Sequence, residues 1–233
     1  NPANGTPITV PSQDMVLGLY YITKVRPGAK GEGMNFYGPE EVIVAYNEKA
    51  IDMHAEIGVR LPVDKMDPSK GYEIKKTTAG RIIVNQYVPD EVPYVNEILG
   101  KKSLRKIITE VIKSTGVTRT AQFLDDIKNL GYDQAFRAGI SFNLGDVIIP
   151  AEKASLIEEG YKQVEEVKNN YAMGFITNNE RYNKVIDLWG AIDNKLTKIV
   201  EKQISADQQG FNPVYMMLDS GARGSTQQIK QLC

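Results

Sequence analysis

Cysteine, histidine and tryptophan are almost absent from this chain of 233 residues, which has one of each. The single cysteine, Cys233, excludes a disulfide within the chain and a cysteine-cluster zinc site. A formal net charge of −1 provides no overall basic field, so any nucleic-acid contact must be local. No apolar run is long enough to cross a membrane, and no secretory signal opens the sequence. These absences favour a cytoplasmic protein with no membrane partner.

Residue sets for independent catalysis are missing too. The only histidine, His54, falls on the polar face of a predicted strand, where a solvated side chain is the simplest interpretation. There is no Cys/His pair, metal-ligand cluster or nucleophile elbow. The neighbouring carboxylates Asp125 and Asp126 would point about 100° apart on a helix and so would not converge on one substrate. We therefore expect the isolated chain to be inactive and to bind no metal or cofactor.

Residues 1–149 mix strand-like and helical patterns. The patterns predict, in order, a β-rich run Met15–Val25, a short helix Pro39–Lys49, a one-sided strand Ile51–Leu61, a loop Pro62–Gly71 and a strand Arg81–Val88. The strand Ile51–Leu61 is predicted from strict alternation of apolar and polar residues. Small mixed sheets with accompanying helices define an α+β class.

Helical periodicity then takes over. One helix is predicted from Ser103 until Gly116, and a second is predicted to be capped by Thr120 and to end before Gly131. A short further helix around Phe136 and a strand or extended return over Ser141–Ile149 complete this half.

The clearest local pattern is a protruding antiparallel hairpin from Pro150 to about Ser205. Apolar residues recur at steps of three and four along two helices, as in a coiled-coil seam. Thr177 and Glu180 form a capping box at the start of the second helix. The tip residues Phe175 and Ile176 could anchor a partner, although a packed hairpin with a solvated outside explains the same pattern.

The end of the chain places one arginine among small residues. Gly221 and Gly224 flank Ala222 and Arg223, so the backbone can approach another group closely while the guanidinium fork meets a phosphate or carboxylate. The string is not a P-loop, because its glycine spacing and its ending differ. The motif alone favours a solvated turn with a surface arginine.

Longer strings carry a resemblance to a known family. Three of them closely resemble segments of the bacterial RNA polymerase β′ subunit, in the same order as in that family: the opening Asn1–Tyr21, Glu180-Arg-Tyr-Asn-Lys-Val-Ile-Asp187 and Tyr215-Met-Met-Leu-Asp-Ser-Gly-Ala-Arg-Gly-Ser225. Gly31-Glu-Gly-Met34 and Gly38-Pro39 match as well. The resemblance covers essentially the whole chain and starts and stops inside the family's sequence. We therefore expect a piece of a larger subunit.

The resemblance implies a place in the polymerase. Residues 1–149 would form the pore, the wall of the secondary channel through which nucleotides enter. Residues 150–233 would form the funnel, with the hairpin (about 150–205) as the channel rim and residues 206–233 returning toward the active centre. The three catalytic aspartates that hold Mg²⁺ would lie outside this chain, as would a structural Zn²⁺ site.

The resemblance also assigns residues. Arg223 would face the phosphates of the incoming nucleotide, and Gln13 would lie near the same centre, although a turn-stabilising amide is an equal alternative for Gln13. Arg181, Asn183 and Lys184 would line the rim where transcript-cleavage factors dock.

In some lineages Asn183, Lys184 and Asp125 also match contacts to guanosine tetraphosphate, but the sequence around Asp125 departs from those lineages at several positions. A solvated helix face is the alternative for all four rim residues.

The implied partners are the β, α, ω and sigma subunits, nucleoside triphosphates, template DNA, the RNA 3′ end and secondary-channel factors. The alternative from another class is a stand-alone helical-hairpin interaction module without catalysis. Co-purification with template-dependent RNA synthesis would separate the two.

Overall fold

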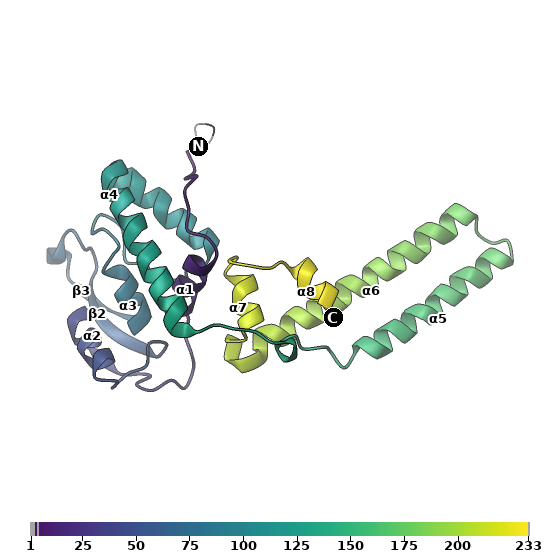
Figure 1. Cartoon of the computed structure of the whole chain (residues 1–233), viewed down its shortest axis with the longest axis horizontal. Helices are drawn as coiled ribbons and strands as arrows, with labels where there is room; N and C mark the ends of the chain where they lie inside the picture. Colours follow the sequence, from purple (N-terminus) through teal and green to yellow (C-terminus); the bar gives the residue numbers. More distant parts are fainter. Residues whose placement is uncertain (1–2, 4, 233) are drawn as a thin grey trace. The chain divides into compact units, whose positions relative to one another are not determined.

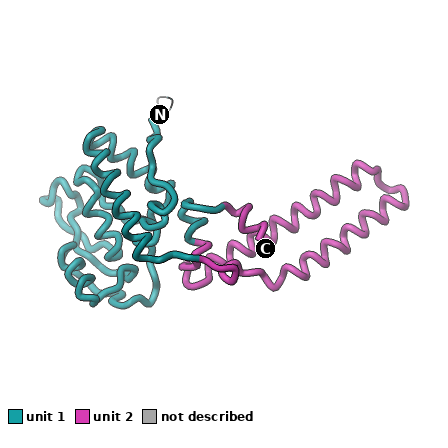
Figure 2. Tube along the Cα trace, in the orientation of Figure 1, with its two compact units in different colours: residues 1–141, 216–224 teal, residues 142–215, 225–233 magenta. Residues whose placement is uncertain are grey.

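The computed structural model describes residue 3 and residues 5–232, and it divides into two compact units (Figure 2). Unit 1 comprises residues 1–141 and 216–224, and unit 2 comprises residues 142–215 and 225–233. Unit 1 contains a small sheet and several helices, whereas unit 2 is built around a helical hairpin (Figure 1). The predicted α+β class is confirmed.

Unit 1 packs its helices around and beside a three-stranded sheet. β1 runs parallel to β2, and β2 runs antiparallel to β3, with Arg60 opposite Ile74. Its elements are α1 (Asp14–Thr23), β1 (Asn35–Phe36), α2 (Pro39–Asn47), β2 (Glu56–Pro62), the 3-10 turn η1 (Pro68–Lys70), β3 (Tyr72–Thr78), α3 (Ala79–Asn85) and α4 (Lys101–Ala138).

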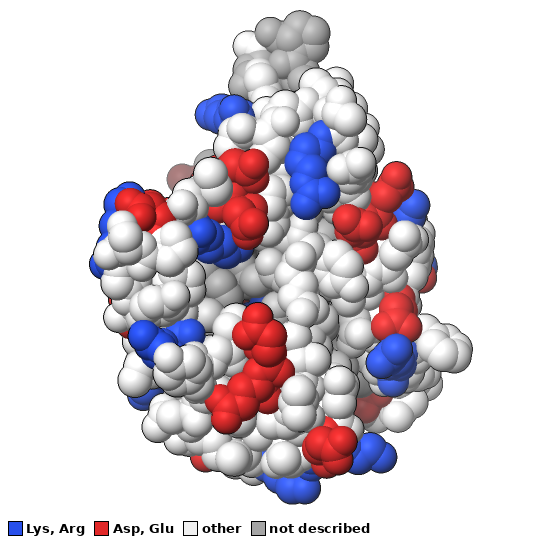
Figure 3. Space-filling model, turned by 90° about the vertical axis from the view of Figure 1, so that its left-hand side faces the viewer, with Lys and Arg blue, Asp and Glu red and all other residues white. Residues whose placement is uncertain are grey.

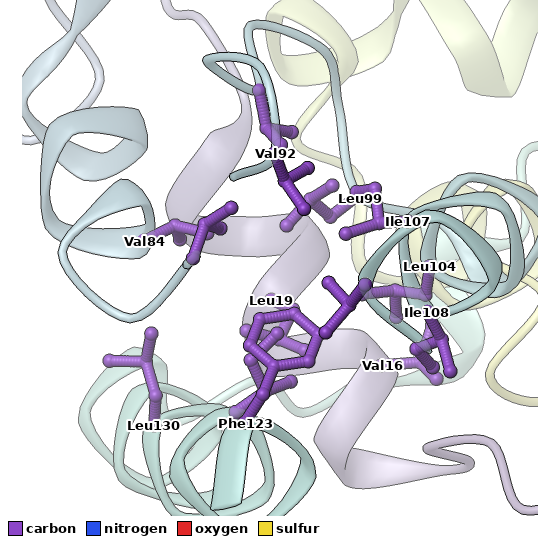
Figure 4. Packing of buried hydrophobic residues seen from close by; sticks show 14 of the residues in the cluster. Val16, Leu19, Val84, Val92, Leu99, Leu104, Ile107, Ile108, Phe123 and Leu130 are labelled. Carbon is purple, nitrogen blue, oxygen red and sulfur yellow. The ribbon is translucent and has the colours of Figure 1, made fainter. Parts of the chain in front are cut away.

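Two hydrophobic clusters hold unit 1 together. The larger one joins α1 to the end of α3, to the segment 88–99 and to both halves of α4 (Figure 4). Its centre includes Leu19, Leu104 and Phe123, which are almost completely buried. The smaller cluster covers one face of the sheet and includes Val42 of α2, Val59 of β2 and Ile82 of α3. Burial of apolar side chains is the dominant favourable contribution to folding.

The strand predicted for Met15–Val25 is wrong, because these residues form helix α1. The helix is buried almost all round, so it lacks the one-sided pattern that identifies an amphipathic helix. Its aromatic and β-branched residues also favour strands by composition. The buried residues are Val16, Leu17, Gly18, Leu19, Tyr20, Ile22 and Thr23.

Helix α4 is one element of 38 residues with a kink at Gly116, where φ is 79°. The predicted interruption at Gly116 is therefore confirmed as a kink. Thr120 does not cap a new helix, because its hydroxyl donates to the Gly116 carbonyl. The predicted end before Gly131 is wrong: the helix continues to Ala138, since Gly131 serves close packing against α1.

The second strand predicted at Arg81–Val88 is also wrong. Thr78 caps α3 there, accepting a hydrogen bond from the Arg81 amide at 3.2 Å. The antiparallel partner of β2 is β3, and its charged residues Glu73, Lys75 and Lys76 hide it from a hydrophobicity pattern. The predicted strand Ile51–Leu61 is shortened to Glu56–Pro62, and the helix predicted from Pro39 is confirmed as α2.

Unit 2 confirms the predicted hairpin. Helices α5 (Lys153–Ala172) and α6 (Asn178–Ala206) pack along the seam, where a β-carbon on Gly160 would lie 2.5 Å from Ile192. The rings of Tyr161 and Trp189 meet edge to face at 5.2 Å. The predicted capping box between Thr177 and Glu180 is present.

Short elements complete the chain: η2 (Leu144–Asp146), η3 (Asp207–Gly210), α7 (Pro213–Asp219) and α8 (Thr226–Leu232). A 3-10 turn, η2, thus occupies part of the segment Ser141–Ile149 that was predicted to be extended. The residues of α7 belong to unit 2 up to Tyr215 and to unit 1 from Met216 onward. Arg223, which follows α7, therefore belongs to unit 1.

Candidate functional site

Within unit 1 the glycine-flanked arginine lies against the start of α1. The Nη2 atom of Arg223 is 3.2 Å from Oδ1 of Asp14 and 3.4 Å from Oε1 of Gln13. These partners are 209 and 210 residues away along the chain. The structure therefore brings together Arg223 and Gln13, the two residues that the sequence placed near one centre.

A compact turn presents the arginine. Gly221 and Gly224 have φ of 70° and 82°, in the left-handed region that glycine adopts at little cost. The Arg223 amide donates to the Met217 carbonyl at 3.3 Å, and the Ala222 amide donates to the Ser220 hydroxyl at 3.2 Å. Turn geometry, rather than a helix or strand, thus sets the direction of this side chain.

Gln13 has an unusual backbone. Its φ of 52° and ψ of −124° are costly for a residue with a β-carbon, by about 1–3 kcal/mol. Its carbonyl accepts the first helical hydrogen bond of α1, from the Leu17 amide at 3.1 Å. Strain of this kind concentrates at functional positions, and Gln13 lies at the N-terminus of α1, the positive end of the helix dipole.

The ion pair between Arg223 and Asp14 is exposed. The two side chains retain 56% and 51% of their accessible surface, so solvent screens the pair and it stabilises the fold little. A guanidinium carries five N–H donors, and the two contacts to Asp14 and Gln13 both use Nη2. Donors therefore remain available for an anion such as a phosphate.

A more buried group of side chains lies below this site. The Tyr20 hydroxyl donates to Oδ2 of Asp219 at 2.6 Å and accepts from Nζ of Lys24 at 3.0 Å. Burial lowers the pKa of Lys24, and the charge of Asp219 opposes that shift. Sequence reasoning missed these residues, although the (i, i+4) spacing of Tyr20 and Lys24 would have indicated a contact had α1 been recognised as a helix.

His54 lies in the interior, which corrects the prediction of a solvated side chain. It is 3% exposed, and its Nδ1 lies 2.9 Å from the Lys24 carbonyl. A carbonyl only accepts, so Nδ1 carries the proton. Burial lowers the pKa of His54, more than the hydrogen bond raises it. The ring is structural here, and Tyr21 meets it edge-on at 4.6 Å.

Unit 2 holds three of the predicted rim residues on α6. The Arg181 guanidinium donates to Oδ1 of Asn178 at 2.8 Å and lies over the Tyr171 ring at 5.2 Å. Asn183 and Lys184 are exposed. At the tip of the hairpin Phe175 is 75% exposed, whereas Ile176 is half-buried.

Asp125, the fourth predicted rim residue, belongs to α4 of unit 1. It is exposed and forms an ion pair with Lys128 at 2.8 Å.

Acidic and basic side chains are interspersed on the face seen in Figure 3. That face therefore offers no extended field of one sign.

Within residues 3 and 5–232, no group of three or more histidine, cysteine, aspartate or glutamate side chains could hold a metal ion. In the same residues no helix combines the length and the apolar character that a bilayer crossing requires.

Comparison with known proteins defines the class. Residues 1–147 match the family described as RNA polymerase Rpb1, domain 3, and residues 176–233 match RNA polymerase Rpb1, domain 4. The chain belongs to this family of RNA polymerase subunits, whose bacterial members are the β′ subunits.

The relatives carry that name. The chain is 63% identical to the DNA-directed RNA polymerase subunit beta' of Bacteroides fragilis over 234 residues, which cover 100% of the chain. It is 62% identical to that of Parabacteroides distasonis and 52% identical to that of Flavobacterium johnsoniae. The chain spans 16% of the length of each of these relatives.

Proposed function

We propose that this chain works as part of a DNA-dependent RNA polymerase, where unit 1 forms the wall of the nucleotide-entry channel and the hairpin forms its rim. Arg223, supported by Gln13, contacts the phosphates of the incoming nucleotide. The observation that carries this proposal is the contact of Arg223 with the N-terminus of α1, where an exposed cation lies beside Gln13 and still has N–H donors available.

The chemistry follows from the group types. A guanidinium stays protonated at every physiological pH, so Arg223 orients and neutralises a triphosphate without moving a proton. The Gln13 amide adds a donor of its own beside it. In this proposal Mg²⁺ supplies the Lewis-acid chemistry from another segment of the subunit, and the partners are the other polymerase subunits, template DNA and RNA.

The test is Arg223→Ala in the assembled polymerase. A hydrogen bond to a charged group contributes about 1.5–3 kcal/mol, so the KM for nucleoside triphosphates should rise by about 10- to 100-fold. Binding of template DNA should stay unchanged. An unchanged dependence of RNA synthesis on nucleotide concentration would refute the role of Arg223.

Arg137→Ala is the matched control. Arg137 forms an ion pair with Asp133 at 3.0 Å, and it is 62% exposed, close to the 56% of Arg223. The loss of an exposed arginine as such is therefore reproduced, while the proposed phosphate site is untouched. Assembly is read in the same preparations: a chain that co-purifies with no polymerase subunit would favour the stand-alone interaction module.

The rim role rests on separate residues. Asn183 and Lys184 are exposed on α6 close to the hairpin tip, where a docking factor would reach them. The double variant Asn183→Ala, Lys184→Ala should weaken binding of a transcript-cleavage factor and leave factor-free RNA synthesis intact. Lys162→Ala, which removes an exposed lysine paired with Glu158 on α5, is the control. Equal factor affinity in all three enzymes would refute this role.

A further inference from the structure

Two contacts join α1 to the segment that carries Arg223, and they differ in burial. The outer contact is the exposed pair of Arg223 with Asp14. The inner contact is the hydrogen bond from the Tyr20 hydroxyl to Asp219. Tyr20 is 1% exposed and Lys24, which donates to the same hydroxyl, is 8% exposed, whereas Asp219 reaches them from the surface.

We propose that Tyr20 is a positioning residue, whose hydrogen bond to Asp219 holds the turn 220–224 so that Arg223 stays at the start of α1. The placement of Arg223 follows from the geometry alone. Only the consequence for nucleotide use rests on the proposed function.

The spacing of the contacts supports this role. Asp219 is the last residue of α7, and Arg223 follows four positions later. Between them the buried Ser220 accepts a hydrogen bond from the Lys101 amide at 2.9 Å, at the beginning of α4. The turn is thus attached to α1 on both sides and to α4 in the middle, which leaves the backbone before Arg223 little freedom.

The chemistry of the inner contact makes it the firmer of the two. Lys24 is removed from water, and such an ammonium requires hydrogen bonds and a nearby negative charge. The Tyr20 hydroxyl accepts a hydrogen bond from Lys24, and the Asp219 carboxylate, to which that hydroxyl donates, supplies the negative charge. The exposed pair at Asp14 is screened by solvent and cannot hold the turn by itself.

The experiment compares Tyr20→Phe, Arg223→Ala and the double variant in the assembled polymerase. Tyr20→Phe removes a single oxygen atom, so folding and assembly should be preserved. Its KM for nucleoside triphosphates should rise by about 3- to 10-fold, the range for one hydrogen bond, with kcat and DNA binding unchanged. The double variant should match Arg223→Ala alone, because both changes act through the same guanidinium.

A second readout follows the arginine itself. The rate at which phenylglyoxal modifies Arg223, mapped by mass spectrometry, should rise in Tyr20→Phe, while Arg137 in the same sample serves as the internal reference. Tyr94→Phe is the matched control, because it removes another hydroxyl contact of unit 1, to Thr77 at 2.8 Å, away from the site. Tyr94→Phe should change neither the KM for nucleoside triphosphates nor the rate at which phenylglyoxal modifies Arg223.

The outcomes separate the two ideas. If Arg223→Ala raises the KM but Tyr20→Phe changes neither readout, or if the two substitutions are additive, the positioning role is overturned and the nucleotide role stands. If Tyr20→Phe accelerates modification of Arg223 but Arg223→Ala leaves the KM unchanged, the positioning role stands and the nucleotide role falls.

Discussion

Gly18 of α1 and Gly131 of α4 face each other so closely that a β-carbon on Gly18 would lie 1.9 Å from the Gly131 carbonyl oxygen. The backbone oxygen cannot move aside without disturbing α4. We expect Gly18→Ala to destabilise unit 1 by about 3 kcal/mol, the upper part of the range for overpacking. Hydrogen exchange of α1 and α4 peptides measures this as lost protection.

Gly190→Ala is the control for that substitution. Gly190 lies inside α6, and nothing lies within 4 Å of the position that its β-carbon would take. Since alanine favours a helix interior over glycine by about 1 kcal/mol, this variant should be more stable than the parent chain. Loss of protection in both variants would show that the contact with Gly131 is not the cause.

Gly116 produces a second kind of glycine effect. Its φ of 79° is in the left-handed region, but nothing lies within 4 Å of its β-carbon position. Gly116→Ala should therefore cost about 1–3 kcal/mol through backbone strain alone, because this φ together with a ψ of −178° is a conformation that essentially only glycine adopts. Thermal unfolding followed by circular dichroism measures the loss, and an unchanged unfolding midpoint would contradict it.

The cap of α6 gives a prediction for unit 2. The Thr177 side chain accepts from the Glu180 amide, and Glu180 accepts from the Thr177 amide at 2.7 Å. Thr177→Ala should destabilise the hairpin by about 1 kcal/mol, whereas Thr177→Ser should retain the cap. Trp189, the only tryptophan, reports hairpin unfolding by fluorescence. Equal midpoints for the alanine and serine variants would refute the capping role.

His54 makes stability depend on pH. Burial lowers its pKa in the folded chain below the ordinary value of about 6.5, so the native ring resists protonation that the unfolded chain accepts. The contribution is fully present above pH 6.5 and is lost as the pH falls toward the folded pKa, by at most about 1.4 kcal/mol per pH unit.

Urea unfolding of the parent chain and of His54→Gln at pH 7.5 and pH 5.5 tests this. The parent chain should lose more of its unfolding free energy on acidification than the variant does. An identical loss in both would show that His54 does not carry the effect.

Sequence patterns predicted the hairpin well but misassigned α1 and α3. The seam of α5 and α6 has one apolar stripe and a capping box, so local signals and tertiary packing agree there. Helix α1 is buried on nearly every side. Gly18 allows the close contact with Gly131, although glycine is unfavourable inside a helix. Tertiary packing overrides local preference at these positions.

The candidate site was predicted only in part. Arg223 and Gln13 were identified from their strings, whereas the contact with Asp14 and the inner group of Tyr20, Lys24 and Asp219 were not. The contacts of Arg223 with Asp14 and of Tyr20 with Asp219 join residues about 200 positions apart, and no local pattern reports such a pairing. The contact of Tyr20 with Lys24 was missed because α1 was predicted as a strand. The solvated His54 was predicted from a strand that begins only at Glu56, two residues later.

The hydrogen bond between Tyr20 and Asp219 also has a consequence for synthesis on the ribosome. Its partners are 199 residues apart, and all of unit 2 except its last segment is translated between them. At a translation rate of about 5–20 residues per second, about 10–40 s pass between the synthesis of Tyr20 and that of Asp219. Throughout that interval the nascent chain carries α1 without the turn that completes it, so the Arg223 site is among the last parts of unit 1 to form.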